Sequence, residues 1–388
     1  MDLALTEEQS LLKDTVTRFL QERSPFETLA EARTREVGWR PEIWTELAEL
    51  GLLGLPFAED DGGFGGGPEE TMIVMEALGA AQPPEPYLST AILGGAIVKA
   101  AHEPVRQQFI SAIASGEARL AVAWQEAGTR WLPEDTAATA EPAGNGFVLS
   151  GKKSFVADLP GASHVVVVAR LGGGLGLFLV GEDALPGRCR GYATPDGRRA
   201  GDLVLDGLAV DADALLVAPD EGADVLAFAL DAAAAAVACE AVGAMQAALD
   251  LTVDYLRTRN QFGVVIGTFQ ALQHRAADMY IALEQARSMA MRAIVAQSTL
   301  APDEAAREIA ATMVQVIDSA RFVGQQAIQL HGGIGMTEEY RLGILFRRLT
   351  MIARQFGDRD HFMDRLVAGP SLLGPNPGCR LDLECLEA

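Results

Sequence analysis

The segment QLHGGIGM, residues 329–336, interrupts a long helical pattern and fixes the plan of the C-terminal half of the chain. Gly332, Gly333 and Gly335 allow positive φ, and glycines of this kind commonly end a helix. Apolar residues recur at helical spacing on both sides of the segment. They predict four long helices, over residues 222–258, 269–299, 303–331 and 338–366. Four such helices with short links predict an antiparallel bundle.

The three glycines allow two interpretations. A glycine cluster between helices is usually a C-cap followed by a turn. A bare glycine backbone also allows close approach by another group, so the same turn is suited to lie against something outside this chain. The segment alone does not decide between them.

Between residues 118 and 220 the pattern changes to short runs rich in β-branched residues, such as HVVVVAR and DLVLDGLAV. No helix-length segment separates these runs, which predicts an antiparallel sheet or small barrel. No GxGxxG motif opens a helix here, so a dinucleotide-binding fold of the Rossmann type is not expected. Residues 1–117, ahead of these runs, have helical periodicity.

We therefore expect an α+β protein in four parts. They are an N-terminal helical domain (1–117), a middle antiparallel β domain (118–220), a C-terminal four-helix bundle (221–367) and a Pro- and Gly-rich tail (368–388) that is loosely held.

Composition narrows the classes of function. The net charge of −22 argues against nucleic acid and against an anionic membrane, since both require a basic surface. The four cysteines form no CxxC motif and the five histidines form no HxxxH pair, which favours reduced thiols in a cytoplasm and no metal site. The most apolar tract, residues 225–245, contains Asp231 and Glu240 and predicts a buried helix, with no membrane insertion.

A second motif, RTRNQFGVVIGTFQALQH at residues 257–274, lies between the first two bundle helices. Arg259 can cap a helix and Phe262 and Phe269 can fill a core, which is the ordinary role of such residues. Together with QLHGGIG they have a second use. An arginine can neutralise a diphosphate, an amide such as that of Gln261 can bond a ribose or adenine, and bare glycine backbone can lie against the rest.

With both motifs and the helix–sheet–helix plan, the sequence resembles the acyl-CoA dehydrogenase family over nearly its whole length. LTEEQSLL near the start and LPFAEDDGGFGG also match the family. The nearest resemblance is to the small subunits of heteromeric pimeloyl-CoA and steroid side-chain acyl-CoA dehydrogenases. It implies FAD as cofactor, an acyl-CoA substrate and an electron-transfer flavoprotein as electron acceptor.

The chemistry that the resemblance implies requires a carboxylate to take the α-proton while a hydride leaves the β-carbon for the flavin. Most family members carry this glutamate where Phe356 stands here, and others carry it on the first bundle helix, at the position of Ala233. Neither side chain can accept a proton. We expect no catalytic residue in this chain.

The resemblance also places this chain's own flavin contacts, and they are altered. Gln125 and Trp131 stand where the family has a threonine and a serine, and Phe155 and Ala157 replace a tryptophan and a threonine. The lost hydroxyls are hydrogen-bonding groups for a flavin, and an indole would crowd the same space. Asp358 and Asp360 put negative charge where neutral groups would meet the cofactor.

In this family each flavin is shared between two subunits, and the neighbour supplies the turns that match the two motifs. Those motifs are intact here. The resemblance therefore implies that this chain lends contacts to FAD in a homologous catalytic subunit. The residues expected to do so are Arg259, Gln261, Phe262, Ile266, Phe269, Gln329, Gly332 and Gly333.

Two alternatives remain open. The chain could be a self-sufficient flavoenzyme whose base has moved to Asp358 or Glu126. It could also be a scaffold or binding protein that kept the fold and lost the chemistry. The identity of the acyl group does not follow from the sequence.

Overall fold

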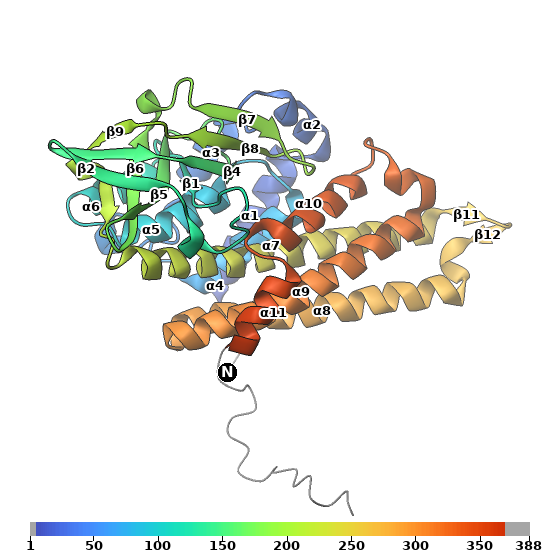
Figure 1. Ribbon diagram of the computed structural model, residues 1–388. Helices are drawn as coiled ribbons and strands as arrows, with labels where there is room; N and C mark the ends of the chain where they lie inside the picture. The colour runs from blue at the N-terminus through green and yellow to red at the C-terminus, as the bar shows by residue number, and fades with distance from the viewer. Residues whose placement is uncertain (1–4, 369–388) are drawn as a thin grey trace, which may run out of the picture.

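The computed structural model describes residues 5–368, and it has helices at both ends of the chain around a strand-rich middle (Figure 1). The predicted α+β fold is confirmed. The predicted tail lies outside the described residues except for Ala368, the last residue of α11.

The N-terminal part is helical. Its elements are α1 (Glu7–Arg23), α2 (Phe26–Thr34), α3 (Pro41–Glu49), α4 (Pro68–Ala81), the π-helix η2 (Leu88–Gly94), α5 (Gly95–Lys99) and α6 (Val105–Ala114). Thr6 caps α1, because its hydroxyl accepts from the Gln9 amide and the Gln9 side chain accepts from the Thr6 amide. The apolar face of α3 buries Ile43, Trp44 and Leu47.

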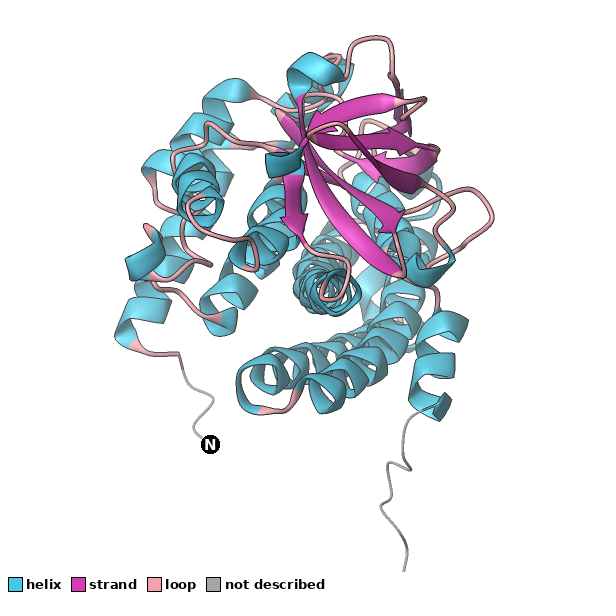
Figure 2. Cartoon of the chain, turned by 60° about the vertical axis from the view of Figure 1, so that its left-hand side comes forward, coloured by secondary structure: helices cyan, strands magenta, loops and turns pink. Residues whose placement is uncertain are grey.

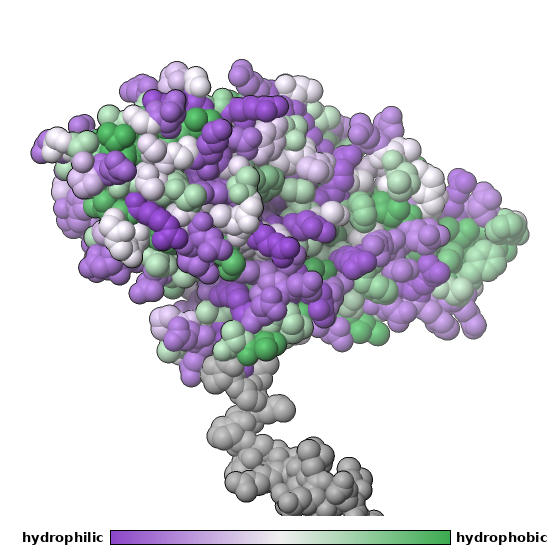
Figure 3. Space-filling model, viewed as in Figure 1, coloured by the Kyte–Doolittle hydropathy of each residue, from purple (hydrophilic) through white to green (hydrophobic). Residues whose placement is uncertain are grey.

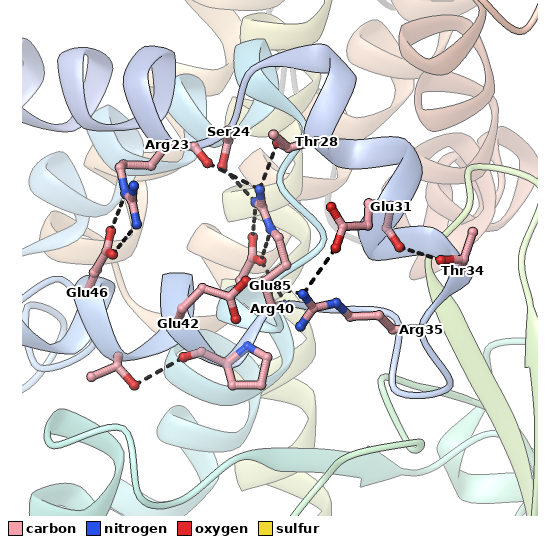
Figure 4. Close-up of polar contacts among 12 residues, drawn as sticks. Arg23, Ser24, Thr28, Glu31, Thr34, Arg35, Arg40, Glu42, Glu46 and Glu85 are labelled. Atoms are coloured by element: carbon pink, nitrogen blue, oxygen red, sulfur yellow. Dashed lines mark hydrogen bonds and ion pairs between the residues drawn. The ribbon is translucent and has the colours of Figure 1, made fainter.

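A buried arginine fastens these helices to one another (Figure 4). Arg40, which precedes α3, is 4% exposed, and its Nε lies 2.9 Å from Oε1 of Glu85. Its remaining donors reach the Ser24 and Thr28 hydroxyls and the Arg23 carbonyl. Glu85 lies just ahead of η2, so this pair joins the α1–α2 corner to the segment that leads into the core.

The middle part holds two sheets. The strands are β1 (Leu120–Ala123), β2 (Thr139–Ala143), β3 (Gly146–Ser150), β4 (Lys152–Ala157), β5 (His164–Leu171), β6 (Gly174–Gly181), β7 (Cys189–Ala193), β8 (Arg199–Val204), β9 (Leu208–Asp211) and β10 (Leu215–Val217). Seven form a sheet in the order β10-β6-β5-β2-β3-β9, with β1 beside β5, and β4-β8-β7 form a second sheet. Figure 2 shows the strands on one side of the molecule and the long helices on the other.

Most strand pairs are antiparallel, as expected, but β1 and β2 pair with β5 in parallel. The chain passes through β2, β3 and β4 before β5 enters beside β1 in the same direction. The valine run of β5 is buried on both faces. Val166 and Val168 join the helical core, whereas Val165 and Val167 face a separate core within the sheets.

The C-terminal part is the bundle. It comprises α7 (Gly222–Thr258), a small hairpin of β11 (Asn260–Gln261) and β12 (Val264–Val265), α8 (Gln270–Thr299), α9 (Pro302–His331), α10 (Leu342–Gln355) and α11 (Arg359–Ala368). The expected single fourth helix is wrong, because it divides into α10 and α11. Phe356 ends α10, and the Asp358 carboxylate accepts from the His361 amide at the start of α11.

The long helix α7 runs through the centre of the structure. It is long and apolar enough to cross a membrane, but 67% of its most apolar window is buried against other elements. Two glycines let α4 approach it closely. A Cβ at Gly79 would lie 2.0 Å from the Glu240 carbonyl, and one at Gly243 would lie 1.9 Å from the Glu76 carbonyl. The burial of α7 therefore comes from protein neighbours.

We predict that Arg40→Ala lowers the free energy of unfolding by about 3–5 kcal/mol, because it leaves Glu85 buried without its partner. Arg23→Ala is the matched control, since the Arg23–Glu46 pair in Figure 4 is exposed and contributes little. Urea unfolding followed by circular dichroism measures both. Equal effects of the two substitutions would contradict the prediction.

Candidate functional site

The two sequence motifs meet at one end of the bundle (Figure 1). The β11–β12 hairpin follows α7, and the turn η7 (Gly332–Met336) follows α9. The Tyr255 ring near the end of α7 stacks on the His331 ring at the end of α9, with centroids 4.6 Å apart. We call this part of the molecule, residues 259–270 and 329–340, the hairpin end.

The side chains predicted to contact a cofactor are exposed at the hairpin end. Ile266 is half-buried, whereas the other seven are open to solvent: Arg259, Gln261, Phe262, Phe269, Gln329, Gly332 and Gly333. Gly332 has φ 64°, and a Cβ added at Gly332 or Gly333 would meet nothing within 4 Å. The glycine turn therefore presents uncovered backbone.

Helix capping and core packing, the ordinary roles of such residues, do not explain the exposed Arg259 and Phe262 side chains. The Arg259 amide caps α7 through the Tyr255 carbonyl, but within residues 5–368 its guanidinium has no hydrogen-bond or ion-pair partner. Phe262 fills no core, because 91% of it is exposed. Exposed Phe262, Val264, Phe269, Ile334 and Met336 give the hairpin end an apolar surface. Figure 3 is green at the tip where Figure 1 places the β11–β12 hairpin. Such a surface is typical of an interaction site.

The positions expected to hold a catalytic base lie elsewhere in the structure, and Phe356 lines a small cavity between the sheets and the bundle. Ala233 on α7 is fully buried and Phe356 is 7% exposed. Along α7, Ala233 is about 39 Å from Arg259, at 1.5 Å per residue. No side chain spans that distance, so the two regions of one chain cannot contact the same reacting atoms.

The cleft beside Phe356 is filled by the chain's own side chains. The remaining cavity, about 20 Å³, is lined by Leu88, Gln125, Phe155, Ala157 and Phe356 among others. An adjoining cavity of about 30 Å³ reaches Asp158. Each has room for a water molecule or two, whereas ligand sites generally measure 300–1,000 Å³. The residues present do not fit a flavin ring in this cleft.

Phe155 contributes to this filling, whereas Trp131 contacts α10 and α11. The Trp131 Nε1 donates to the Arg354 carbonyl at 3.1 Å, and its ring lies 5.8 Å from the His361 ring. Trp131 thus bridges from the loop after β1 to α10 and α11. Phe155 has φ 53° and lines both small cavities. The bulk expected at residue 131 is present in the structure.

Glu126, one alternative base, is held in a different environment. Its carboxylate accepts from the Lys153 ammonium at 2.6 Å, from the Thr136 hydroxyl and from the amides of Ala137 and Ala138. Burial alone would raise the pKa of Glu126, but the hydrogen bonds from Lys153 and Thr136 outweigh it and lower the pKa to about 2. A carboxylate stabilised this strongly in its ionised form is a poor general base.

Asp358, the other alternative, has a structural contact as well. Its carboxylate accepts a hydrogen bond from the His361 amide at 2.9 Å. Asp358 also lines a groove of about 520 Å³ between α9, α10 and α11. Asp318, Arg321, Arg359 and Asp360 line the same groove. Asp358 is not among the residues that line the small cavities of the cleft.

The sequence reasoning overlooked three carboxylates, of which Asp158 lines the second small cavity. Asp158 accepts from the Ser89 hydroxyl, and burial raises the pKa of Asp158. Asp231, two residues from Ala233, pairs with Arg365 at 2.8 Å, and Glu240 pairs with Arg348 at 2.6 Å. The position of Asp158 directly after Ala157 is the one signal that could have identified it. Each of these acids is engaged with its own neighbour.

Over residues 5–368 no group of three or more His, Cys, Asp and Glu side chains is arranged to hold a metal ion.

Two family comparisons match this architecture. Residues 6–117 match "Acyl-CoA dehydrogenase, N-terminal domain" and residues 220–361 match "Acyl-CoA dehydrogenase, C-terminal domain". The chain belongs to the acyl-CoA dehydrogenase family. The resemblance inferred from the two motifs is thereby confirmed. Members of this family are oxidoreductases that bind FAD.

Individual acyl-CoA dehydrogenases align along nearly their whole length. Probable acyl-CoA dehydrogenase YngJ of Bacillus subtilis is 28% identical, with 96% of this chain and 100% of the relative covered. The solved Tcur3481–Tcur3483 steroid ACAD variant is 31% identical with a TM-score of 0.85, covering 93% of this chain and 97% of that one. The ChsE4–ChsE5 complex of Mycobacterium tuberculosis is 26% identical with a TM-score of 0.87, covering 96% and 100%.

The environment of Glu126 gives a test of its structural role. We expect the stability difference between the wild type and Glu126→Gln to be greatest above about pH 4.5, the ordinary pKa of the unfolded group, and to narrow as the pH falls toward 2. The sign follows because a lowered folded-state pKa stabilises the fold only while the group is ionised. Urea unfolding at a series of pH values measures this difference, and one that stays constant across the range would contradict the assignment.

Proposed function

We propose that this acyl-CoA dehydrogenase family member is a non-catalytic subunit of a heteromeric enzyme that introduces an α,β double bond into a CoA thioester. It lends its hairpin end to FAD bound by a homologous catalytic subunit. The observation that carries the proposal is the contrast between its two regions. The cleft beside Phe356 is filled and has no free base, whereas Arg259, Gln329 and the glycine turn are exposed.

The chemistry assigned to each exposed group is limited and specific. FAD, when bound in the partner, accepts the hydride of the reaction. The Arg259 guanidinium is suited to neutralise its diphosphate through charge-assisted hydrogen bonds. Gln261 and Gln329 offer amide donors and acceptors, Phe262 and Phe269 offer apolar surface, and Gly332 and Gly333 permit close backbone approach.

Assembly with a different subunit is supported by two observations. The ChsE4–ChsE5 and Tcur3481–Tcur3483 relatives are each solved as combinations of two named proteins. In this chain, a self-sufficient enzyme would need a base that neither Ala233 nor Phe356 supplies. We propose a heterotetramer in the cytoplasm, acting in steroid or dicarboxylate degradation, with electrons passing from the partner's flavin to an electron-transfer flavoprotein.

The alternative of a relocated base is disfavoured by the contacts of Glu126 and Asp358 described above. The scaffold alternative differs from the proposal in the flavin content that it predicts for the complex. A complex of this chain with its relative that contains no flavin would favour the scaffold, and a chain that is yellow when purified alone would favour self-sufficiency.

We predict that Arg259→Ala weakens FAD binding by the complex roughly ten- to one-hundredfold, because a hydrogen bond to a charged group contributes about 1.5–3 kcal/mol. Arg257→Ala, also exposed in the last turn of α7, is the matched control and should leave FAD affinity unchanged. Flavin fluorescence titration of the complex measures both. An unchanged affinity in the Arg259→Ala complex would contradict the proposal.

We also predict one flavin per heterodimer. Introducing a carboxylate through Ala233→Glu or Phe356→Glu creates no second active site, because the filled cleft does not fit a flavin and a buried unpaired glutamate is destabilising. Flavin absorbance against protein concentration gives the stoichiometry. Two flavins per heterodimer would mean that this chain has a working site of its own.

A further inference from the structure

A buried histidine lies in the second segment of the hairpin end, residues 329–340. His331, the last residue of α9, is 3% exposed and is followed directly by Gly332 and Gly333. Its ring stacks on Tyr255 with centroids 4.6 Å apart and planes 25° apart. On another side the Tyr340 ring lies 5.2 Å away, tilted by 52°. We call Tyr255, His331 and Tyr340 the aromatic stack.

Both ring nitrogens of His331 have partners. The Nδ1 lies 2.8 Å from the Ala327 carbonyl, which can only accept, so Nδ1 carries the proton. The Nε2 lies 3.2 Å from the Tyr340 hydroxyl and is left to accept from it. Burial lowers the pKa of His331 and outweighs the opposing effect of the Ala327 and Leu251 carbonyls, which favours the neutral imidazole. A leucine could fill the same space but could neither donate to Ala327 nor accept from Tyr340.

The aromatic stack joins the two segments that carry the proposed FAD contacts to the segment that precedes α10. Tyr255 is in the last turn of α7, and its carbonyl accepts the Arg259 amide at 2.9 Å. His331 ends α9 at the glycine turn, and Tyr340 precedes α10. The contacts of the Tyr255 and Tyr340 rings with His331 therefore determine the separation between Arg259 and the Gly332–Gly333 backbone.

We infer that His331 is a positioning residue that, through Tyr255 and Tyr340, holds Arg259 and the Gly332–Gly333 turn at the spacing required to contact one FAD molecule. The inference rests on the proposed function, because the FAD is that of the partner subunit. His331 itself is buried beneath the exposed turn, so it acts on the cofactor only through its neighbours.

The test uses the complex of this chain with its flavin-binding partner. His331→Leu removes both hydrogen bonds and is expected to weaken FAD binding about tenfold, comparable to losing the positioning effect of one or two hydrogen bonds. His331→Gln can donate and accept at similar positions and is expected to restore most of the affinity. Tyr255→Phe keeps the stacked ring and is expected to match the wild type, whereas Tyr255→Leu is not.

Two controls separate positioning from general destabilisation. Val316→Ala removes buried volume from the same helix without touching the aromatic stack, and it is expected to lower the melting temperature while leaving FAD affinity unchanged. Tyr340→Phe deletes a single hydroxyl and keeps the test available if His331→Leu does not fold. A loss of FAD affinity in Val316→Ala equal to that in His331→Leu would overturn the inference.

Arg259→Ala provides the reference that distinguishes the two proposals. If Arg259→Ala weakens FAD binding and neither His331→Leu nor Tyr340→Phe does, the positioning role is overturned and the proposed function stands. If Arg259→Ala has no effect, the proposed function fails and the positioning role fails with it. Weakening by Arg259→Ala and by both stack variants, with rescue by His331→Gln, supports both.

Discussion

The ion pair between Arg348 and Glu240 is the interaction on which the placement of the sheets over the bundle depends. Arg348 of α10 binds Glu240 of α7 through two nitrogens, at 2.6 and 2.7 Å, and reaches Asp196 in the turn between β7 and β8 at 3.1 Å. Arg198 in that turn also binds Glu240 at 2.6 Å. Burial opposes the ionisation of Glu240, but Arg198 and Arg348 lower its pKa. Breaking a pair like this leaves a buried charge, so the sheets stay fixed over the bundle.

Fixing the sheets over the bundle also fixes the cleft. Gln355 accepts from Arg348, and the next residue, Phe356, fills the space where a base would stand. At the other end of α7 the chain has no comparable enclosure, and Phe262 and the glycine turn project from the protein. A single rigid helix thus separates a closed region from an open one. Under the proposed function, this separation explains how one chain lacks an active site of its own and still presents a surface to a related subunit.

The sequence allowed the fold to be predicted wherever local pattern decides it. Glycines 332 and 333 end α9 where predicted, and the valine run of residues 165–168 forms a buried strand. The break between α10 and α11 was missed, because apolar spacing continues through Gly357 and the capping role of Asp358 appears only with the amide of His361 in place. Long-range partners were missed for a similar reason. Nothing local shows that Glu126 meets Lys153, and its role as a relocated base had to remain open until their 2.6 Å contact was seen.

The filled cleft also bears on how the subunit is made. Many cofactor-binding chains gain stability from their ligand by mass action and fold less completely when it is scarce. Here Phe155 and Phe356 pack into the cleft, so its packing is supplied by the chain's own side chains. Under the proposed function, the isolated polypeptide therefore reaches its native state whatever the supply of flavin. A shortage of flavin would then limit the assembled enzyme through the partner subunit alone.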